Sequence, residues 1–281
     1  MKRLFLFAAV LLLMAASFNA CTEKPEIDDD IENNGDNNQN GDENNDNNDQ
    51  NGDENNGSGT NSNVKLVKSI KNDNVNLEFE YDSQNRLVKA NMWGTVYLYS
   101  YNGDTMTVTD TEYEDEYVMT LNADGFVTSF DFDGDCNVSN TYNNGYISKI
   151  TTAWDKYDER YNDFVWDNGL LSSITTTYSE NTDFLIKWSF SYDNVQPTPI
   201  NIDIIHLFFD PFGDDFGVTC LGFFGKQSRL YPVKVNLDDD GDKYEISIDY
   251  KFNTDGTIAK ATVNWSGEEG EIDDETFEFS Y

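Results

Sequence analysis

The sequence is poor in the residues on which most catalytic, metal-binding and nucleic-acid-binding sites depend. Its 281 residues include one His and three Cys, and 18 Lys and Arg stand against 53 Asp and Glu. The formal charge of −35 makes a nucleic-acid partner unexpected, because contacts with phosphates need a basic surface. A single imidazole excludes multi-histidine metal sites and most histidine-dependent catalysis. We therefore expect no enzymatic activity, no cofactor and no metal site.

Long apolar runs are also lacking, with one exception at the N-terminus. Residues 1–20 begin with Lys2 and Arg3, continue with an almost wholly apolar run from Leu4 to Ala16, and end in small and polar residues. This run is shorter than the ~20 residues that a membrane-spanning helix needs. Residues 1–20 are therefore predicted to be a signal peptide for export.

A cysteine, Cys21, directly follows the small residue Ala20 at the end of the predicted signal peptide. This arrangement resembles the lipobox of bacterial lipoproteins, with Phe18 where that motif usually carries Leu. The resemblance implies that Cys21 is acylated and that the protein is anchored to a membrane through this lipid. An ordinary signal peptide followed by a chance Cys is the alternative.

The residues after Cys21 are acidic, beginning with Glu23, Glu26 and the run 28–30. They resemble the signal that sends lipoproteins of Bacteroidetes-type bacteria to the outer leaflet of the outer membrane. We expect a lipid-anchored outer-membrane protein exposed at the cell surface. A linker that is simply acidic throughout leaves the choice between the inner and the outer leaflet open.

Apolar side chains are nearly absent from residues 21–63, where Asn, Asp, Gly and Glu dominate and only Ile27 and Ile31 could contribute to a core. Such a segment cannot offset its ordering entropy by burial, so it is predicted to be a disordered acidic tether. The tether explains why hydrophobic residues make up only 38% of the whole chain. The remaining segment, 64–281, is long enough to form one domain with a sizeable core.

Strand patterns recur throughout residues 64–281. Apolar and polar side chains alternate in the segments 75–81, 184–192 and 244–252. This period of two is typical of antiparallel strands that bury one face.

A turn motif separates these strands. An aromatic residue or Leu is followed by Asp or Asn, two variable residues and often Gly, as in the segments 81–87, 121–127 and 252–258. The motif starts at positions 81, 101, 121, 142, 166, 192 and 252, so each interval of 20–26 residues up to position 192 fits one β-hairpin. The predicted fold is all-β, an antiparallel up-and-down meander of twelve to fifteen strands. So many strands must curl into a barrel or half-barrel-like sheet.

The hairpin motif resembles the YD repeats of large bacterial surface proteins, most closely at Tyr81-Asp82 and Arg86-Leu87. The chain as a whole resembles a family of lipoproteins of unknown function from gut Bacteroidetes, described as having a porin-like fold. The segment 221–228, LGFFGKQS, carries this resemblance, and Tyr231-Pro232 stands where the family tends to have Leu-Pro. The resemblance implies a fold and a location but no reaction.

The repeat is interrupted by an apolar insert at about residues 200–232. Its phenylalanines Phe208, Phe209, Phe223 and Phe224 are candidates for lining a cavity that holds a lipid or another apolar ligand. Alternatively, the insert closes one end of the core. The insert also contains His206 and Cys220, but no motif supports a nucleophilic pair. Whether Cys136 and Cys220 form a disulfide is open.

These features favour a binding or scaffold module at the cell surface, with an apolar ligand as the first expectation. Surface glycan binding is the alternative, and it requires Trp93, Trp154 and Trp265 to lie on an exposed face. An integral outer-membrane barrel is a third reading, because the segment 276–281 resembles the last strand of such barrels. Two acidic segments, 131–135 and 236–242, resemble calcium loops but are explained as hairpin turns. The oligomeric state is not indicated.

Overall fold

The computed structural model describes residues 64–281 except positions 93, 133–135, 155–158, 182, 194–196, 210–220 and 268–269. The predicted signal peptide, Cys21 and the predicted tether lie outside the described residues. The described part contains sixteen strands and one α-helix, α2 (Ile204–Phe209).

The strands follow one another along the chain, and most are six to eleven residues long. They are β1 (Ser69–Lys71), β2 (Asn76–Tyr81), β3 (Leu87–Met92), β4 (Thr95–Asn102), β5 (Thr105–Asp110), β6 (Glu116–Leu121), β7 (Val127–Phe132), β8 (Cys136–Asn143), β9 (Tyr146–Ala153), β10 (Glu159–Asp167), β11 (Leu170–Tyr178), β12 (Leu185–Tyr192), β13 (Pro232–Asp239), β14 (Asp242–Phe252), β15 (Ile258–Gly267) and β16 (Gly270–Ser280).

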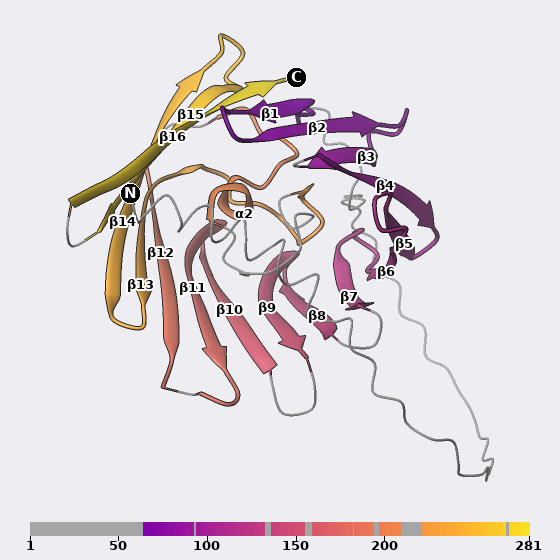
Figure 1. The fold of residues 1–281 in the computed structure, drawn as a ribbon, viewed down its shortest axis with the longest axis horizontal. Helices are drawn as coiled ribbons and strands as arrows, with labels where there is room; N and C mark the ends of the chain where they lie inside the picture. The colour runs from indigo at the N-terminus through magenta and orange to yellow at the C-terminus, as the bar shows by residue number, and fades with distance from the viewer. Residues whose placement is uncertain are drawn as a thin grey trace, which may run out of the picture.

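Each strand pairs antiparallel with the strands before and after it, and β1 pairs with both β2 and β16, so the sheet closes into a barrel (Figure 1). The predicted all-β meander is confirmed, and the sheet is a complete barrel. The number of strands exceeds the expected twelve to fifteen. The segment 276–281, which resembles the last strand of a barrel, lies mostly in β16, the strand that ends at Ser280.

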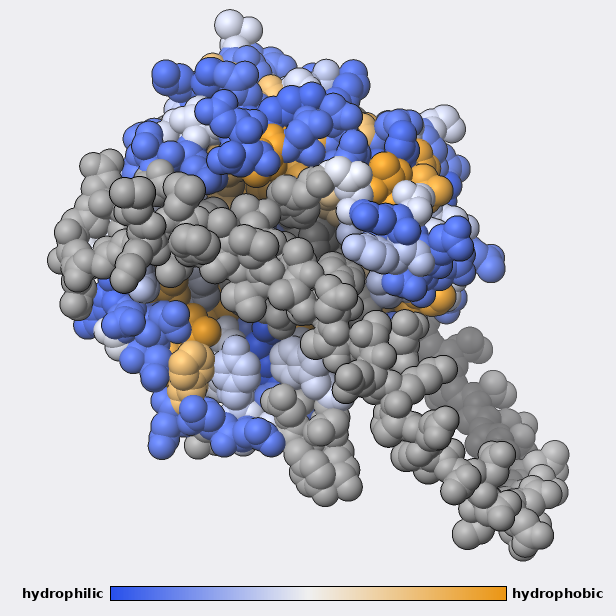
Figure 2. Space-filling model, in the orientation of Figure 1, coloured by the Kyte–Doolittle hydropathy of each residue, from blue (hydrophilic) through white to orange (hydrophobic). Residues whose placement is uncertain are grey.

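The two faces of the barrel wall differ in polarity. In β2, Leu77 and Phe79 are buried while Glu78 and Glu80 are exposed, and this alternation recurs around the wall. The outer face carries cross-strand ion pairs such as Lys71–Glu78 at 2.9 Å and Lys89–Glu80 at 2.7 Å. The visible described surface is accordingly mostly hydrophilic (Figure 2). Because these pairs are exposed, each contributes little to stability.

The Tyr or Trp that starts the turn motif at five of its seven positions, and Tyr281 at the end of the barrel wall, make a specific hydrogen bond. The polar ring atom donates to a backbone carbonyl near the start of the preceding strand, at 2.5–3.0 Å. These bonds are Tyr81 to Val67, Tyr101 to Leu87, Tyr142 to Val127, Trp166 to Ile147, Tyr192 to Leu171 and Tyr281 to Ile258. In these six hairpins the bond joins the two strands at the same level of the barrel.

The turn itself is held by its Asp or Asn. The Asp82 carboxylate accepts hydrogen bonds from the backbone N–H groups of Gln84 and Arg86, at 2.8 and 3.0 Å. Asn85 has a φ of 62°, and Gly125 takes the corresponding place in a later copy with a φ of 79°. Such left-handed conformations favour Gly and Asn, which explains the residues of the motif.

The insert between β12 and β13 closes one end of the barrel. Its helix α2 lies within the outline of the barrel, near the end at which the motif turns lie (Figure 1). The backbone of the insert bonds to these turns: Lys226 N–H donates to Gly145 at 2.8 Å, and Val127 N–H donates to Phe223 at 2.9 Å. We call this end the insert end and the opposite one, with the β9–β10 and β11–β12 connections, the far end.

Candidate functional site

The four phenylalanines of the insert are buried, each 5–7% exposed. Three of them pack against aromatic residues of the barrel wall: Phe208 against Phe277 at 5.0 Å between ring centroids, Phe209 against Trp188 and Phe190 at 6.0 and 6.3 Å, and Phe223 against Tyr99 at 6.1 Å. In the described structure they extend the core of the barrel at the insert end. A role in lining a ligand cavity stays a prediction.

Of the other two sequence candidates of the insert, the structure describes His206 and not Cys220. His206 lies on α2, 6% exposed, with its Nδ1 3.4 Å from the Asp203 carboxylate. The same carboxylate accepts a hydrogen bond from the Ile205 backbone at 2.9 Å, so it caps the helix. Cys220 lies outside the described residues, so neither its pairing with half-buried Cys136 nor its approach to His206 is tested.

The acidic turn between β13 and β14 has a structural explanation. Asp238 accepts a hydrogen bond from the Gly241 backbone at 3.0 Å, and Asp240 and Gly241 have φ values of 50° and 102°. Burial, together with the neighbouring carboxylates, raises the pKa of Asp239. Within the described part of the chain, no group of three or more His, Cys, Asp or Glu side chains is placed to hold a metal ion. The one helix described, α2, is too short to span a membrane.

A polar patch interrupts the apolar inner wall on four neighbouring strands, β8 to β11. Its five side chains are at most 7% exposed: Asn140, Thr152, Arg160, Asn162 and Thr176. Strand register places them in two adjacent rows. Asn140 and Asn162 flank Ile150 in one row, which continues to Thr176. Thr152 and Arg160 are directly opposite each other in the next row, towards the far end.

Two amide atoms of this patch have no hydrogen-bond partner among the described residues: Asn140 Oδ1 and Asn162 Nδ2. The other ends of these amides are bonded. Asn140 Nδ2 donates to the Val127 carbonyl at 2.9 Å, and the Thr176 hydroxyl donates to Asn162 Oδ1 at 2.6 Å. An unsatisfied buried polar group costs about 1–3 kcal/mol, so the wall keeps one acceptor and one donor at a cost in stability.

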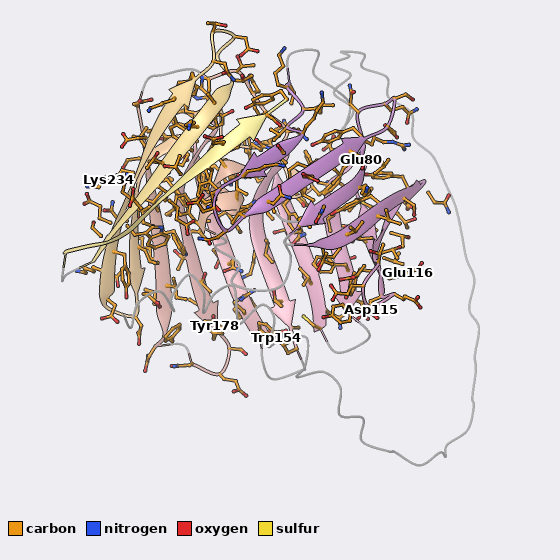
Figure 3. The ribbon with its side chains drawn as sticks, turned by 45° about the horizontal axis from the view of Figure 1, so that its top comes forward. Glu80, Asp115, Glu116, Trp154, Tyr178 and Lys234 are labelled. Atoms are coloured by element: carbon orange, nitrogen blue, oxygen red, sulfur yellow. The ribbon has the colours of Figure 1, made fainter. Side chains whose placement is uncertain are left out.

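Aromatic rings stand at the far end, next to this patch. Trp154 directly follows β9 and is 36% exposed, and Arg160 Cζ lies 5.4 Å from the centroid of its ring. Tyr178 ends β11 opposite Arg160, with the Phe184 ring edge-on at 5.5 Å. Trp154 and Tyr178 lie at the same end of the barrel (Figure 3). We call these two rings and the five patch residues the far-end cluster.

Sequence reasoning had found only one member of the far-end cluster, Trp154. Of the other two tryptophans expected on an exposed face, Trp265 is half-buried and Trp93 lies outside the described residues. The available signal was the alternation Arg160, Asn162, Phe164 in β10, where polar residues share a face with an apolar one. This alternation identifies Arg160 and Asn162 as buried polar residues only when the structure shows that their side of β10 faces the interior.

A groove of about 480 Å³ lies on the outer face of β12 to β15. Its side chains form two cross-strand rows, Lys187–Asp238–Lys243 and Ser189–Asn236–Glu245 with Ser266. The charged members are exposed, and Glu245 also pairs with Lys234 at 2.5 Å. Since these side chains largely neutralise one another in water, the groove offers little that would select a ligand.

Comparison with known proteins supports the fold. A porin-like protein from Bacteroides vulgatus is 16% identical, with a TM-score of 0.58 over 77% of this chain and 98% of that chain. A porin-like protein from Bacteroides uniformis is 14% identical, with a TM-score of 0.58 over 76% of this chain and 97% of that chain. No family model and no curated protein matches. The expected porin-like fold is therefore confirmed, whereas membership of the lipoprotein family stays a prediction.

Proposed function

We propose that this protein is an exported, lipid-anchored binding module whose barrel works in water and is not a transmembrane channel. The observation that carries this proposal is the polarity of the wall. A barrel embedded in a membrane turns its apolar side chains towards lipid. Here Leu77 and Phe79 point inward, while Glu78 and Glu80 on the same strand point outward.

Energetics favour this reading over an integral barrel. A Lys placed on the lipid-facing side costs about 2–4 kcal/mol at the bilayer midplane. The outer face carries Lys71, Lys89, Lys149 and Lys260, each in an exposed ion pair with a carboxylate. The exposed apolar residues of the outer wall, such as Leu98, Val118, Val165 and Leu185, stand on separate strands. They do not form the continuous apolar band that a bilayer needs.

In this proposal the predicted lipid on Cys21 attaches the protein to the membrane, and residues 22–63 form the spacer between the membrane and the barrel. The two fold neighbours come from Bacteroides, which agrees with the expected Bacteroidetes-type export signal. A surface location would give the module access to external ligands.

The test combines acyl labelling with electrical recording on the full-length protein. We expect Cys21→Ala to abolish incorporation of a labelled fatty acid and to release the protein from membranes, whereas the matched control Cys136→Ala keeps both. The purified lipoprotein should give no conductance steps in a planar bilayer. Retention of Cys21→Ala in carbonate-washed membranes, or stepwise conductance, would reject the proposal.

The ligand of the module is the second question, and an apolar ligand remains a candidate because of the insert. Phe208, Phe209 and Phe223 already contact wall aromatics, so such a ligand would have to displace these contacts. Native mass spectrometry of the purified lipoprotein tests whether the insert holds an apolar ligand. If it does, the spectrum should show the mass of a bound lipid in addition to the covalent anchor, and extraction of non-covalently bound lipid should remove this extra mass. The far-end cluster favours the other expected ligand class.

A further inference from the structure

We propose that the far-end cluster binds neutral sugar units of a glycan. This inference rests on the proposed function as a water-facing binding module and names the ligand class of that module. It is carried by a group of buried polar side chains on four neighbouring strands, by two amide atoms without a partner in the described structure, and by aromatic rings beside them.

The composition of the patch points to a ligand with hydroxyl groups. Asn162 Nδ2 is a donor and Asn140 Oδ1 an acceptor, and a hydroxyl group can satisfy either. An apolar ligand would satisfy neither amide. A hydroxyl of a bound ligand would supply the partners that the described residues of the wall do not provide. Replacing the amides by apolar side chains would be an easier route to a stable wall.

The charges around the cluster narrow the ligand class further. The chain carries a formal charge of −35, which repels an anionic ligand at long range. The guanidinium of Arg160 next to the Trp154 ring disfavours a cationic ligand at short range. A neutral polyhydroxylated molecule meets neither obstacle, and guanidinium N–H groups donate to its oxygens.

The order of the groups along the barrel axis also suits a sugar chain. Trp154 and Tyr178 stand at the far end, Thr152 and Arg160 form the next row, and the row with the two Asn residues lies deeper. Four residues along a strand separate Trp154 from the Asn row, which is about 13 Å. Flat rings at the exposed end of the cluster can stack on the apolar face of one sugar ring. The amides are buried, so they would bind hydroxyls further along the chain after the neighbouring side chains move aside.

The experiment is a glycan array probed with the full-length lipoprotein in mild detergent, followed by calorimetry with the oligosaccharide that the array identifies. Trp154→Ala should lower the association constant about tenfold or more. The matched control is Phe252→Ala, which removes an aromatic ring of nearly equal exposure, 37%, at the insert end. This control should leave the affinity unchanged.

A second variant separates binding from stability. Asn162→Leu combined with Thr176→Val replaces a hydrogen-bonded pair by apolar groups of similar shape. We expect the melting temperature to stay the same or rise while sugar binding is lost, a combination that a purely structural patch does not produce.

Three results would overturn the inference: an array that gives no signal with folded protein, a Trp154→Ala variant that binds as well as Phe252→Ala, or a displaceable lipid found in place of a glycan. Failure of the proposed function as a lipid-anchored, water-facing module would be detected in different experiments. It would appear as stepwise conductance in a planar bilayer, or as membrane insertion of the Cys21→Ala variant.

Discussion

The hydroxyl group of Tyr101, on β4, donates a hydrogen bond of 2.9 Å to the carbonyl oxygen of Leu87, where β3 begins. Burial raises the pKa of the Tyr101 phenol, and the Arg86 guanidinium lies 4.7 Å from its ring centroid. The same bond recurs in most hairpins, so it is a structural unit of the barrel. Position 121 holds Leu and makes no such bond. At position 252 the ring is Phe, and Tyr250 donates instead to the Pro232 carbonyl at 3.0 Å.

Removing one such hydroxyl should cost measurable stability. Tyr101→Phe keeps the ring and deletes the bond to Leu87, so we expect the free energy of unfolding to fall by about 0.5–1.5 kcal/mol. Urea denaturation followed by circular dichroism gives this value. The control is Tyr161→Phe, whose hydroxyl bonds to Glu159 near the outer surface and whose loss should change stability by less than about 0.5 kcal/mol. Equal effects of the two substitutions would contradict the role assigned to Tyr101.

The buried tyrosines predict alkaline unfolding. Burial raises the pKa of Tyr97 and of Tyr281 to about 12, and raises the pKa of Tyr142, Tyr192 and Tyr250 as well. A raised pKa in the folded state means that the unfolded state loses its protons first. Stability is therefore fully present below the unfolded value near pH 10 and is lost as the pH rises towards 12. Tyrosinate absorbance and circular dichroism should change together in this range. The prediction is wrong if all tyrosines ionise by pH 10.5 while the circular dichroism still shows the β structure, because the buried hydroxyls would then not have raised pKa values.

The contact of the insert with the motif turns depends on a glycine. Gly225 has a φ of 107°, and a Cβ there would lie 3.0 Å from the Gly145 carbonyl oxygen and 3.1 Å from the Ile147 nitrogen. Gly225→Ala should therefore lower the free energy of unfolding by about 2–3 kcal/mol. At Gly103 the φ is 62° and nothing lies within 4 Å of the added Cβ, so Gly103→Ala should cost only about 1 kcal/mol. Thermal melts of both variants measure the difference, and a Gly225→Ala variant as stable as Gly103→Ala would count against a tightly docked insert.

The free energy of unfolding, measured before and after extraction of non-covalently bound lipid, distinguishes a core role of the insert phenylalanines from a role in lining a lipid site. If Phe209 belongs to the core, Phe209→Ala should lower the free energy of unfolding by about 3–5 kcal/mol both before and after lipid extraction, since its contacts are with Trp188 and Phe190. If it lines a lipid site, the loss should be larger before lipid extraction, because the bound lipid adds stability to the folded state. Phe252→Ala, at a partly exposed position, provides the baseline.

Much of the fold could be predicted because its determinants are local. The alternation in the segment 244–252 and the motif starting at Tyr81 each specify a strand or a turn within a few residues. The helix α2 could not be distinguished from a strand, because five of the six residues from Ile204 to Phe209 are apolar and show no decisive period.

The sequence by itself determined the hairpins, their order and the presence of two faces on every strand, since each depends on neighbours along the chain. The tertiary structure decided which face points inward, that β1 meets β16, and that the insert reaches turns as distant as Gly145 and Gly256. Arg160, Asn162 and Asn140 became neighbours only through strand register and closure of the barrel. Their burial depends on what lies across the interior, and alternation along one strand carries no information about that.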